Sequence, residues 1–170
     1  MCIRDRRRIT TSPDAASIEN LAVAAYQMAV DSGNVTDQAV ADAALLFQSH
    51  HVEHADFWNS MATQAGGEAF TDPNPALLDA LGPDIEEALT SQAGIVALAY
   101  QLEVVAAETY LNEVGGFEDV NLNKAFMSVS GVEARHAMVL ANVLAYTLEQ
   151  AFPEGFLGVD MAVAAGTGVE

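Results

Sequence analysis

Apolar side chains recur every three or four residues in four long stretches of the chain, which is the spacing of one face of an α-helix. Glycine and proline residues separate the stretches and indicate where each helix ends. The predicted helices cover residues 13–32, 36–66, 84–114 and 118–152. Residues 67–83 hold five glycines and prolines, so they predict a long crossover with room for only a short helical turn at 76–81.

Each apolar stripe is interrupted by side chains that carry charge or can bind a metal ion. One such residue lies on the first stripe, two on the second, one on the third and two on the fourth. They are, in chain order, Glu19, His51, His54, Glu103, Glu133 and His136. Because the stripes should face the core, the sequence predicts that these six side chains are buried together.

The two halves of the chain repeat one pattern. Glu19 is followed seven residues later by Tyr26, and Glu103 is followed seven residues later by Tyr110, with small apolar residues between them. The distance from this glutamate to the histidine of the following helix is 35 residues in the first half and 33 in the second. Each half is therefore predicted to be a helical hairpin that presents the same groups at the same depth, which gives a pseudo-two-fold bundle.

The second helix of each hairpin extends the repeat but breaks it at one position. Aligning His54 with His136 places His51 over Glu133. A buried carboxylate without a partner costs several kcal/mol, so three of them on inward stripes would oppose folding unless cations neutralise them. Glu-x-x-His presents two metal ligands on one helix face, and a bundle can bring such pairs together with single glutamates. The pattern therefore predicts a metal site in the core.

Composition supports an all-α fold and narrows the list of partners. Hydrophobic residues make up 51% of the 170 residues and aromatic ones only 7%, and the periodic stretches consist mainly of strong helix formers. The net charge is −18, and only Lys124 and Arg135 are basic beyond Arg8. Nucleic acid is excluded as a partner, since phosphate binding needs clustered basic residues. The acidity fits a solvated, soluble surface or a field that attracts cations, and no stretch predicts a membrane span.

The two ends of the chain differ in character from the predicted bundle. Residues 1–11 begin Met-Cys-Ile-Arg-Asp, which resembles a translated sequencing-library end, so we expect this segment to be disordered or artefactual and the true N-terminus to be missing. Cytoplasmic and exported locations both stay open for that reason. The bundle is expected over 12–152, followed by a loosely ordered tail over 153–170. Cys2 is the sole cysteine, which excludes an internal disulfide and a thiolate metal site.

The repeated frame, with Glu133-Ala-Arg-His136 as its clearest mark, resembles the ferritin-like superfamily, in particular bacterial ferritin-like domain proteins related to rubrerythrins and bacterioferritins. The resemblance covers roughly residues 15–150 and implies an up-down four-helix bundle that binds two metal ions. The positions that match the family's ligands carry Glu19, His54, Glu103, Glu133 and His136. His51 stands where the family has a glutamate that bridges the metals, and an imidazole cannot bridge in the same way.

The resemblance implies two divalent metal ions, iron in first place and manganese in second, with ferrous ion, oxygen or peroxide as reactants. Such a protein would be a di-metal oxidoreductase, although the sequence leaves enzymatic activity and any homo-oligomer undecided. The histidine at position 51 motivates an alternative, a structural or stress-related bundle whose metal site is degenerate, mononuclear or absent.

Five further residues have interpretations that the sequence leaves open. His50 and His54 are four residues apart and form, with Glu53, a rival ligand set, which ranks second because His51 shares the apolar seam of this helix. The two repeated tyrosines are better explained by core packing than by hydrogen bonds to the metal ligands. Glu108 lies off the stripe and is expected to be exposed or at an interface.

Overall fold

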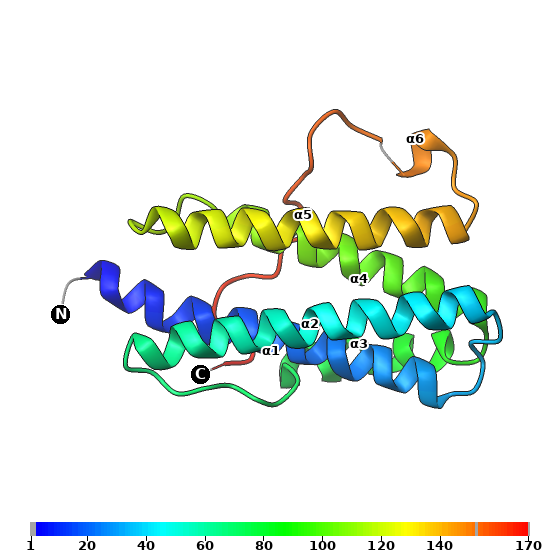
Figure 1. The fold of residues 1–170 in the computed structure, drawn as a ribbon, viewed down its shortest axis with the longest axis horizontal. Helices are drawn as coiled ribbons and strands as arrows, with labels where there is room; N and C mark the ends of the chain where they lie inside the picture. The colour runs from blue at the N-terminus through cyan, green and yellow to red at the C-terminus, as the bar shows by residue number, and fades with distance from the viewer. Residues whose placement is uncertain (1–2, 152, 170) are drawn as a thin grey trace.

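The computed structural model describes residues 3–151 and 153–169, with side chains from residue 14 onward. The described residues form six helices and no strand (Figure 1). The helices are α1 (Ile3–Asp31), α2 (Gln38–Gln64), α3 (Pro75–Ala88), α4 (Gln92–Glu113), α5 (Val120–Val143) and α6 (Leu148–Ala151). No described helix has the length and apolar character that crossing a membrane requires.

The four long helices form two hairpins, as the repeat predicts. Helix α1 packs along α2, and α4 packs along α5, whereas α1 and α4 contact each other only sparsely. The crossover from α2 to α4 includes α3, which packs mainly on α4. The all-α bundle with a long crossover between its second and third long helices is therefore confirmed.

Polar side chains set where the helices begin. Asp37 precedes α2 and accepts hydrogen bonds from the backbone N–H groups of its first turn, and Asp119 does the same for α5. Ser91 adopts an extended conformation and its hydroxyl accepts from the Gly94 N–H, which starts α4. The single helix predicted over 84–114 is therefore wrong, because residues 89–91 are not helical and separate α3 from α4.

Two further helix limits differ from the prediction. The crossover holds a full helix, α3, which begins at Pro75 behind the Asn74 cap and continues through Pro83 on its exposed side. Helix α5 ends at Val143 because Ala145 takes a left-handed conformation and the Tyr146 N–H bonds back to the Ala141 carbonyl, a helix-ending motif that usually uses glycine.

At the N-terminal end, α1 is described from Ile3, upstream of the start predicted at Pro13. Met1, Cys2 and Phe152, the predicted end of the last long helix, lie outside the described residues.

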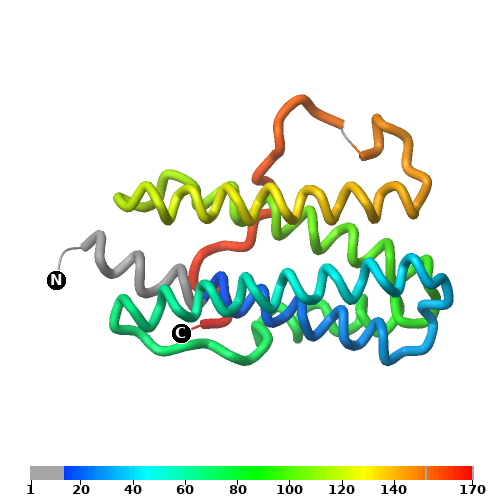
Figure 2. The backbone as a smooth tube through the Cα atoms, in the orientation of Figure 1, coloured from blue at the N-terminus to red at the C-terminus, as the bar shows by residue number. Residues whose placement is uncertain are grey.

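The tail after α6 crosses from the α5 side of the bundle to the α1 side (Figure 2). Its backbone N–H groups bond to side chains of the bundle: Met161 to Glu108 at 2.7 Å, Val163 to Thr109 at 2.9 Å and Gly166 to Asp14 at 2.8 Å. Glu108 is thus buried beneath the tail of its own chain. The tail has no helix among its described residues, yet residues 161–167 are hydrogen-bonded to the bundle.

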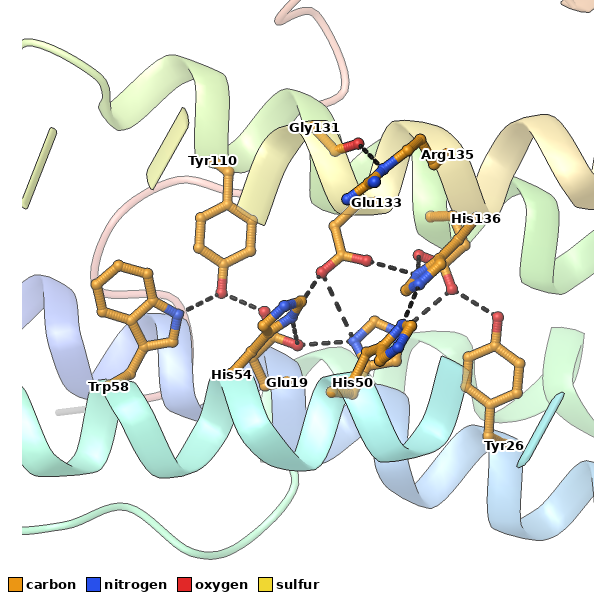
Figure 3. A network of polar contacts seen from close by, with 12 residues as sticks. Glu19, Tyr26, His50, His54, Trp58, Tyr110, Gly131, Glu133, Arg135 and His136 are labelled. Atoms are coloured by element: carbon orange, nitrogen blue, oxygen red, sulfur yellow. Dashed lines mark hydrogen bonds and ion pairs between the residues drawn. The ribbon is translucent and has the colours of Figure 1, made fainter. Parts of the chain in front are cut away.

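Two apolar clusters form the core and leave a polar layer between them. One contains Trp58, Tyr110 and Phe126, and the other contains Phe47 and Tyr26. Figure 3 shows Trp58 and Tyr110 on one side of the polar side chains and Tyr26 on the other. This arrangement keeps the polar layer away from both ends of the bundle.

Candidate metal centre

The structure brings all six predicted ligand residues together in the polar layer of the core. They form two overlapping groups, in each of which the potential ligand atoms lie within 4.8 Å of one another. The groups are Glu19, His51, His54 and Glu133, and His51, Glu103, Glu133 and His136. Because α1, α2, α4 and α5 all contribute, the cluster depends on the complete bundle.

Burial follows the stripe prediction. The three glutamates, His51 and His136 are buried, and Glu133 is fully enclosed at 0% exposure. His54 is the most accessible of the six, with 15% of its side chain exposed. Charged groups of this kind are retained in a core only when they pair with each other or bind cations.

His51 occupies the middle of the cluster, among all three glutamates. Its Nδ1 lies 2.7 Å from a Glu19 oxygen and 3.9 Å from a Glu133 oxygen, and its Nε2 lies 3.2 Å from a Glu103 oxygen. Burial acts to lower the pKa of His51, but Glu103 and Glu19 outweigh it and raise the pKa well above its usual value. The imidazole thus stands where a second carboxylate would complete the repeat.

Glu133 is the residue that best fits a metal ligand. One of its oxygens lies 2.9 Å from Nδ1 of His54 and the other 2.9 Å from Nδ1 of His136. Neither oxygen has a hydrogen-bond partner in proper geometry among the described residues, and the same holds for Nδ1 of His54. Buried polar atoms of this kind are rare in native proteins and need an explanation. Oxygen and nitrogen atoms that lie this close together outside hydrogen-bond geometry could instead coordinate a shared metal ion.

The histidines and glutamates of the cluster shift one another's protonation. Burial acts to raise the pKa of Glu103, but hydrogen bonds from His136 and His51 outweigh it and lower the pKa. Burial lowers the pKa of His54, whereas its neighbours Glu133 and Glu19 raise it to about 9. Three protonated histidines would balance three carboxylates, so the cluster can also neutralise itself without a cation.

The interpretation of the two repeated tyrosines as core packing residues is corrected by the structure. Each tyrosine hydrogen-bonds to a glutamate of the opposite hairpin. Tyr26 on α1 donates to Glu103 on α4 at 2.5 Å, and Tyr110 on α4 donates to Glu19 on α1. Trp58 donates in turn to the Tyr110 hydroxyl at 2.8 Å. Burial raises the pKa of both tyrosines, which keeps them protonated as donors. These bonds fix the orientation of two carboxylates.

His50 does not form the rival ligand set with Glu53, whose side chain is exposed. Instead, Nδ1 of His50 lies 2.9 Å from Nε2 of His136, and the two rings stack with centroids 5.2 Å apart. His136 therefore turns Nδ1 toward the glutamates and Nε2 toward His50. Sequence reasoning missed this contact because it joins α2 to α5, and only the closeness of His50 to His51 in the chain could have drawn attention to it.

The fold and the cluster together define a carboxylate–histidine four-helix bundle, a class in which each half contributes ligands to a shared core site. The sequence matches the ferritin-like domain family over residues 14–146, and the chain belongs to that family. The match contains all six cluster residues and ends before α6 and the tail. No curated protein and no solved structure gave a significant match.

Proposed function

We propose that the six residues hold two divalent metal ions, iron in first place and manganese in second, and that the protein acts in the oxidation or binding of ferrous ion or in the handling of oxygen or peroxide. The observation that supports this most directly is Glu133, a fully enclosed carboxylate whose two oxygens each lie 2.9 Å from a histidine nitrogen, as ion-pair contacts that fall outside hydrogen-bond geometry.

The two groups assign a ligand set to each ion. Glu19 and His54 would serve one, Glu103 and His136 would serve the other, and Glu133 and His51 lie within reach of both. Two iron or manganese ions bound there would supply one-electron redox chemistry toward oxygen or peroxide.

The surrounding side chains prepare the site for this role. The tyrosine hydrogen bonds to Glu19 and Glu103 hold those carboxylates in fixed orientations, so little ordering is needed when a cation binds. Phe47 stacks on His136 with ring centroids 4.0 Å apart, and Trp58 closes the other side of the layer. Apolar walls of this kind limit access of water to the centre.

Metal counting after anaerobic loading tests the proposal. The purified full chain is incubated with ferrous ion, desalted and analysed for metal, alongside a Glu103→Ala/Glu133→Ala variant. Glu53→Ala serves as the matched control, because Glu53 is exposed on α2 beside the cluster. We expect about two irons per chain in the wild type and the control, and fewer than one in the double variant. Equal retention in all three proteins would contradict the proposal.

A second candidate function is a structural or stress-related bundle with a degenerate, mononuclear or absent metal site. It is favoured by His51, which replaces a carboxylate and can neutralise its glutamate neighbours by protonation. A cation that binds only the native state must raise the melting temperature. A melting temperature unchanged by iron, manganese and zinc would therefore support this second candidate against the first.

A further inference from the structure

A cavity of about 230 Å³ lies beside the metal centre, between α1, α3 and α4. Its lining is apolar except for three side chains, Tyr26, His51 and Glu103. Most of the lining residues are leucine, isoleucine or valine, and eight are alanines, among them Ala22, Ala25, Ala29, Ala80, Ala88 and Ala99. Alanine at these positions leaves space that a larger aliphatic side chain would fill.

The helix that roofs the cavity is fixed at both ends. At its start, the Asn74 N–H bonds to the Ser17 carbonyl at 3.0 Å, and the Asn74 side chain donates to the Ser17 hydroxyl at 2.9 Å. Beyond its end, the Leu89 carbonyl accepts from the Asn34 side chain at 2.6 Å. These three bonds tie the two ends of α3 to α1 or to the residues just after α1. Collapse of the roof onto the cavity would break them, so the space is built into the fold.

The polar part of the lining is a single spot. The Tyr26 hydroxyl lies 2.5 Å from a Glu103 oxygen, and Nε2 of His51 lies 3.2 Å from the same oxygen. The rings of Tyr26 and His51 stack with centroids 5.6 Å apart. A ligand in the cavity therefore meets hydrogen-bonding groups at one place and hydrocarbon everywhere else.

The size and walls of the cavity select the kind of molecule that it can hold. Apolar cavities of roughly 150 Å³ stay dry and bind benzene. This cavity is about half as large again, and by the same scale it accommodates an aliphatic ligand of about nine carbon atoms. The cavity is partly open to solvent, but water is poorly held in its interior, because each molecule needs two to four polar partners and the walls supply them at one spot only.

We propose that this cavity binds a linear alkyl chain with one polar head group, the head lying against Tyr26, His51 and Glu103 and the chain lying between α1 and α4 under α3. The inference rests on the cavity alone, so it is independent of whether the centre binds metal. It places an aliphatic molecule next to the same side chains that the proposed metal centre uses.

Calorimetric titration of the full chain with 1-decanol and with decanoate tests the inference, the first probe having a neutral head and the second an anionic one. We expect one molecule per chain with a micromolar Kd for at least one probe. The Ala99→Leu variant narrows the cavity and should weaken binding at least tenfold. Ala93→Leu, at an exposed position of the same helix, is the matched control and should bind within twofold of the wild type.

A chain-length series on the wild type provides a second measurement that needs no variant. Affinity should rise from hexanoate to decanoate, as each added methylene buries apolar surface, and should stop rising once the cavity is full. Absence of binding by both probes would overturn the inference. An affinity that keeps rising up to hexadecanoate would also overturn it. Ala25→Leu narrows the cavity from α1 as Ala99→Leu does from α4, and wild-type affinity in both variants would overturn the inference as well.

Metal content measured on the same samples separates the two proposals. Alkyl binding in a protein that retains no iron or manganese would leave the cavity inference standing and contradict the metal proposal. Two metals per chain without alkyl binding would support the metal proposal and overturn the cavity inference.

Discussion

The two hairpins build their halves of the centre from the same plan, yet they differ at one position on the second helix of each. The α4–α5 hairpin presents Glu133, which reaches histidines of both hairpins, whereas the α1–α2 hairpin presents His51 at the equivalent place. A carboxylate can share its two oxygens between two cations, and a neutral imidazole can bind only one. The two hairpins therefore repeat one arrangement of paired helices, but the centre between them is asymmetric in charge.

The same difference also affects the charge of the cluster without a cation, because protonated His51 can neutralise one of the buried carboxylates. Four buried carboxylates with two histidines would carry a large uncompensated charge, whereas three carboxylates with three histidines can be neutral. The histidine would thus stabilise the fold in the absence of metal and, with two cations bound as proposed, would lower the affinity for them. The predictions below separate these two effects.

The largest effect is expected for Glu133→Gln, which removes the carboxylate that both ligand groups share. Changes outside the first ligand shell weaken metal binding by about 10- to 100-fold, so loss of this shared ligand should exceed that range. Equilibrium dialysis with ferrous or manganous ion measures the change. Glu53→Gln on the exposed face of α2 is the control and should bind like the wild type.

His51→Glu should restore the symmetry between the hairpins. With two divalent ions bound, a fourth glutamate would neutralise the site, and we expect the affinity for the second ion to rise at least tenfold. In a chelator the same variant should melt at a lower temperature than the wild type, because four carboxylates then repel one another. An unchanged second affinity would indicate that His51, not a missing carboxylate, is the preferred ligand there.

The pH dependence of stability tests the charge balance directly. The pKa of His54 is about 9 in the folded protein, above its ordinary value of 6.5. The raised value means that protonated His54 stabilises the fold fully below pH 6.5 and that this contribution is lost as the pH rises through 9. Chemical denaturation in chelator should show a decrease of roughly 3 kcal/mol from this residue over that window. His54→Gln should flatten the dependence, and an equally steep curve in that variant would contradict the assignment.

The sequence predicts the six clustered residues, and the difference between His51 and Glu133 in the two hairpins. It does so because each of the six residues interrupts an apolar stripe whose period is that of the helix itself. It does not predict which hairpin each tyrosine serves, because Tyr26 and Tyr110 bond across to α4 and α1. Nor does it give the end of α5, where alanine takes the left-handed position that glycine usually occupies. Such features depend on how separate segments meet, which one helix's pattern does not record.

The alanine-lined cavity is a further case of the same limit. Ala22 and Ala106 occupy equivalent places in the two halves of the repeat and both line the cavity, yet small residues on a stripe equally predict tight packing of two helices. The sparse contact between α1 and α4, with α3 fixed above them, is what turns these positions into a cavity. The period of the stripe gives the face of a helix but not its distance from the next helix.

The smallest effects are expected at the two tyrosines, and they compare the hairpins once more. Tyr26→Phe removes one hydrogen bond to Glu103 and should lower the free energy of unfolding by about 1 kcal/mol. Tyr110→Phe should lower it by about 2 kcal/mol, because it leaves the Trp58 N–H unpaired as well as removing the bond to Glu19. Urea denaturation of both variants in chelator measures the difference. Equal losses would mean that Trp58 finds another partner, and a larger loss for Tyr26→Phe would contradict the bonding scheme that links the two hairpins.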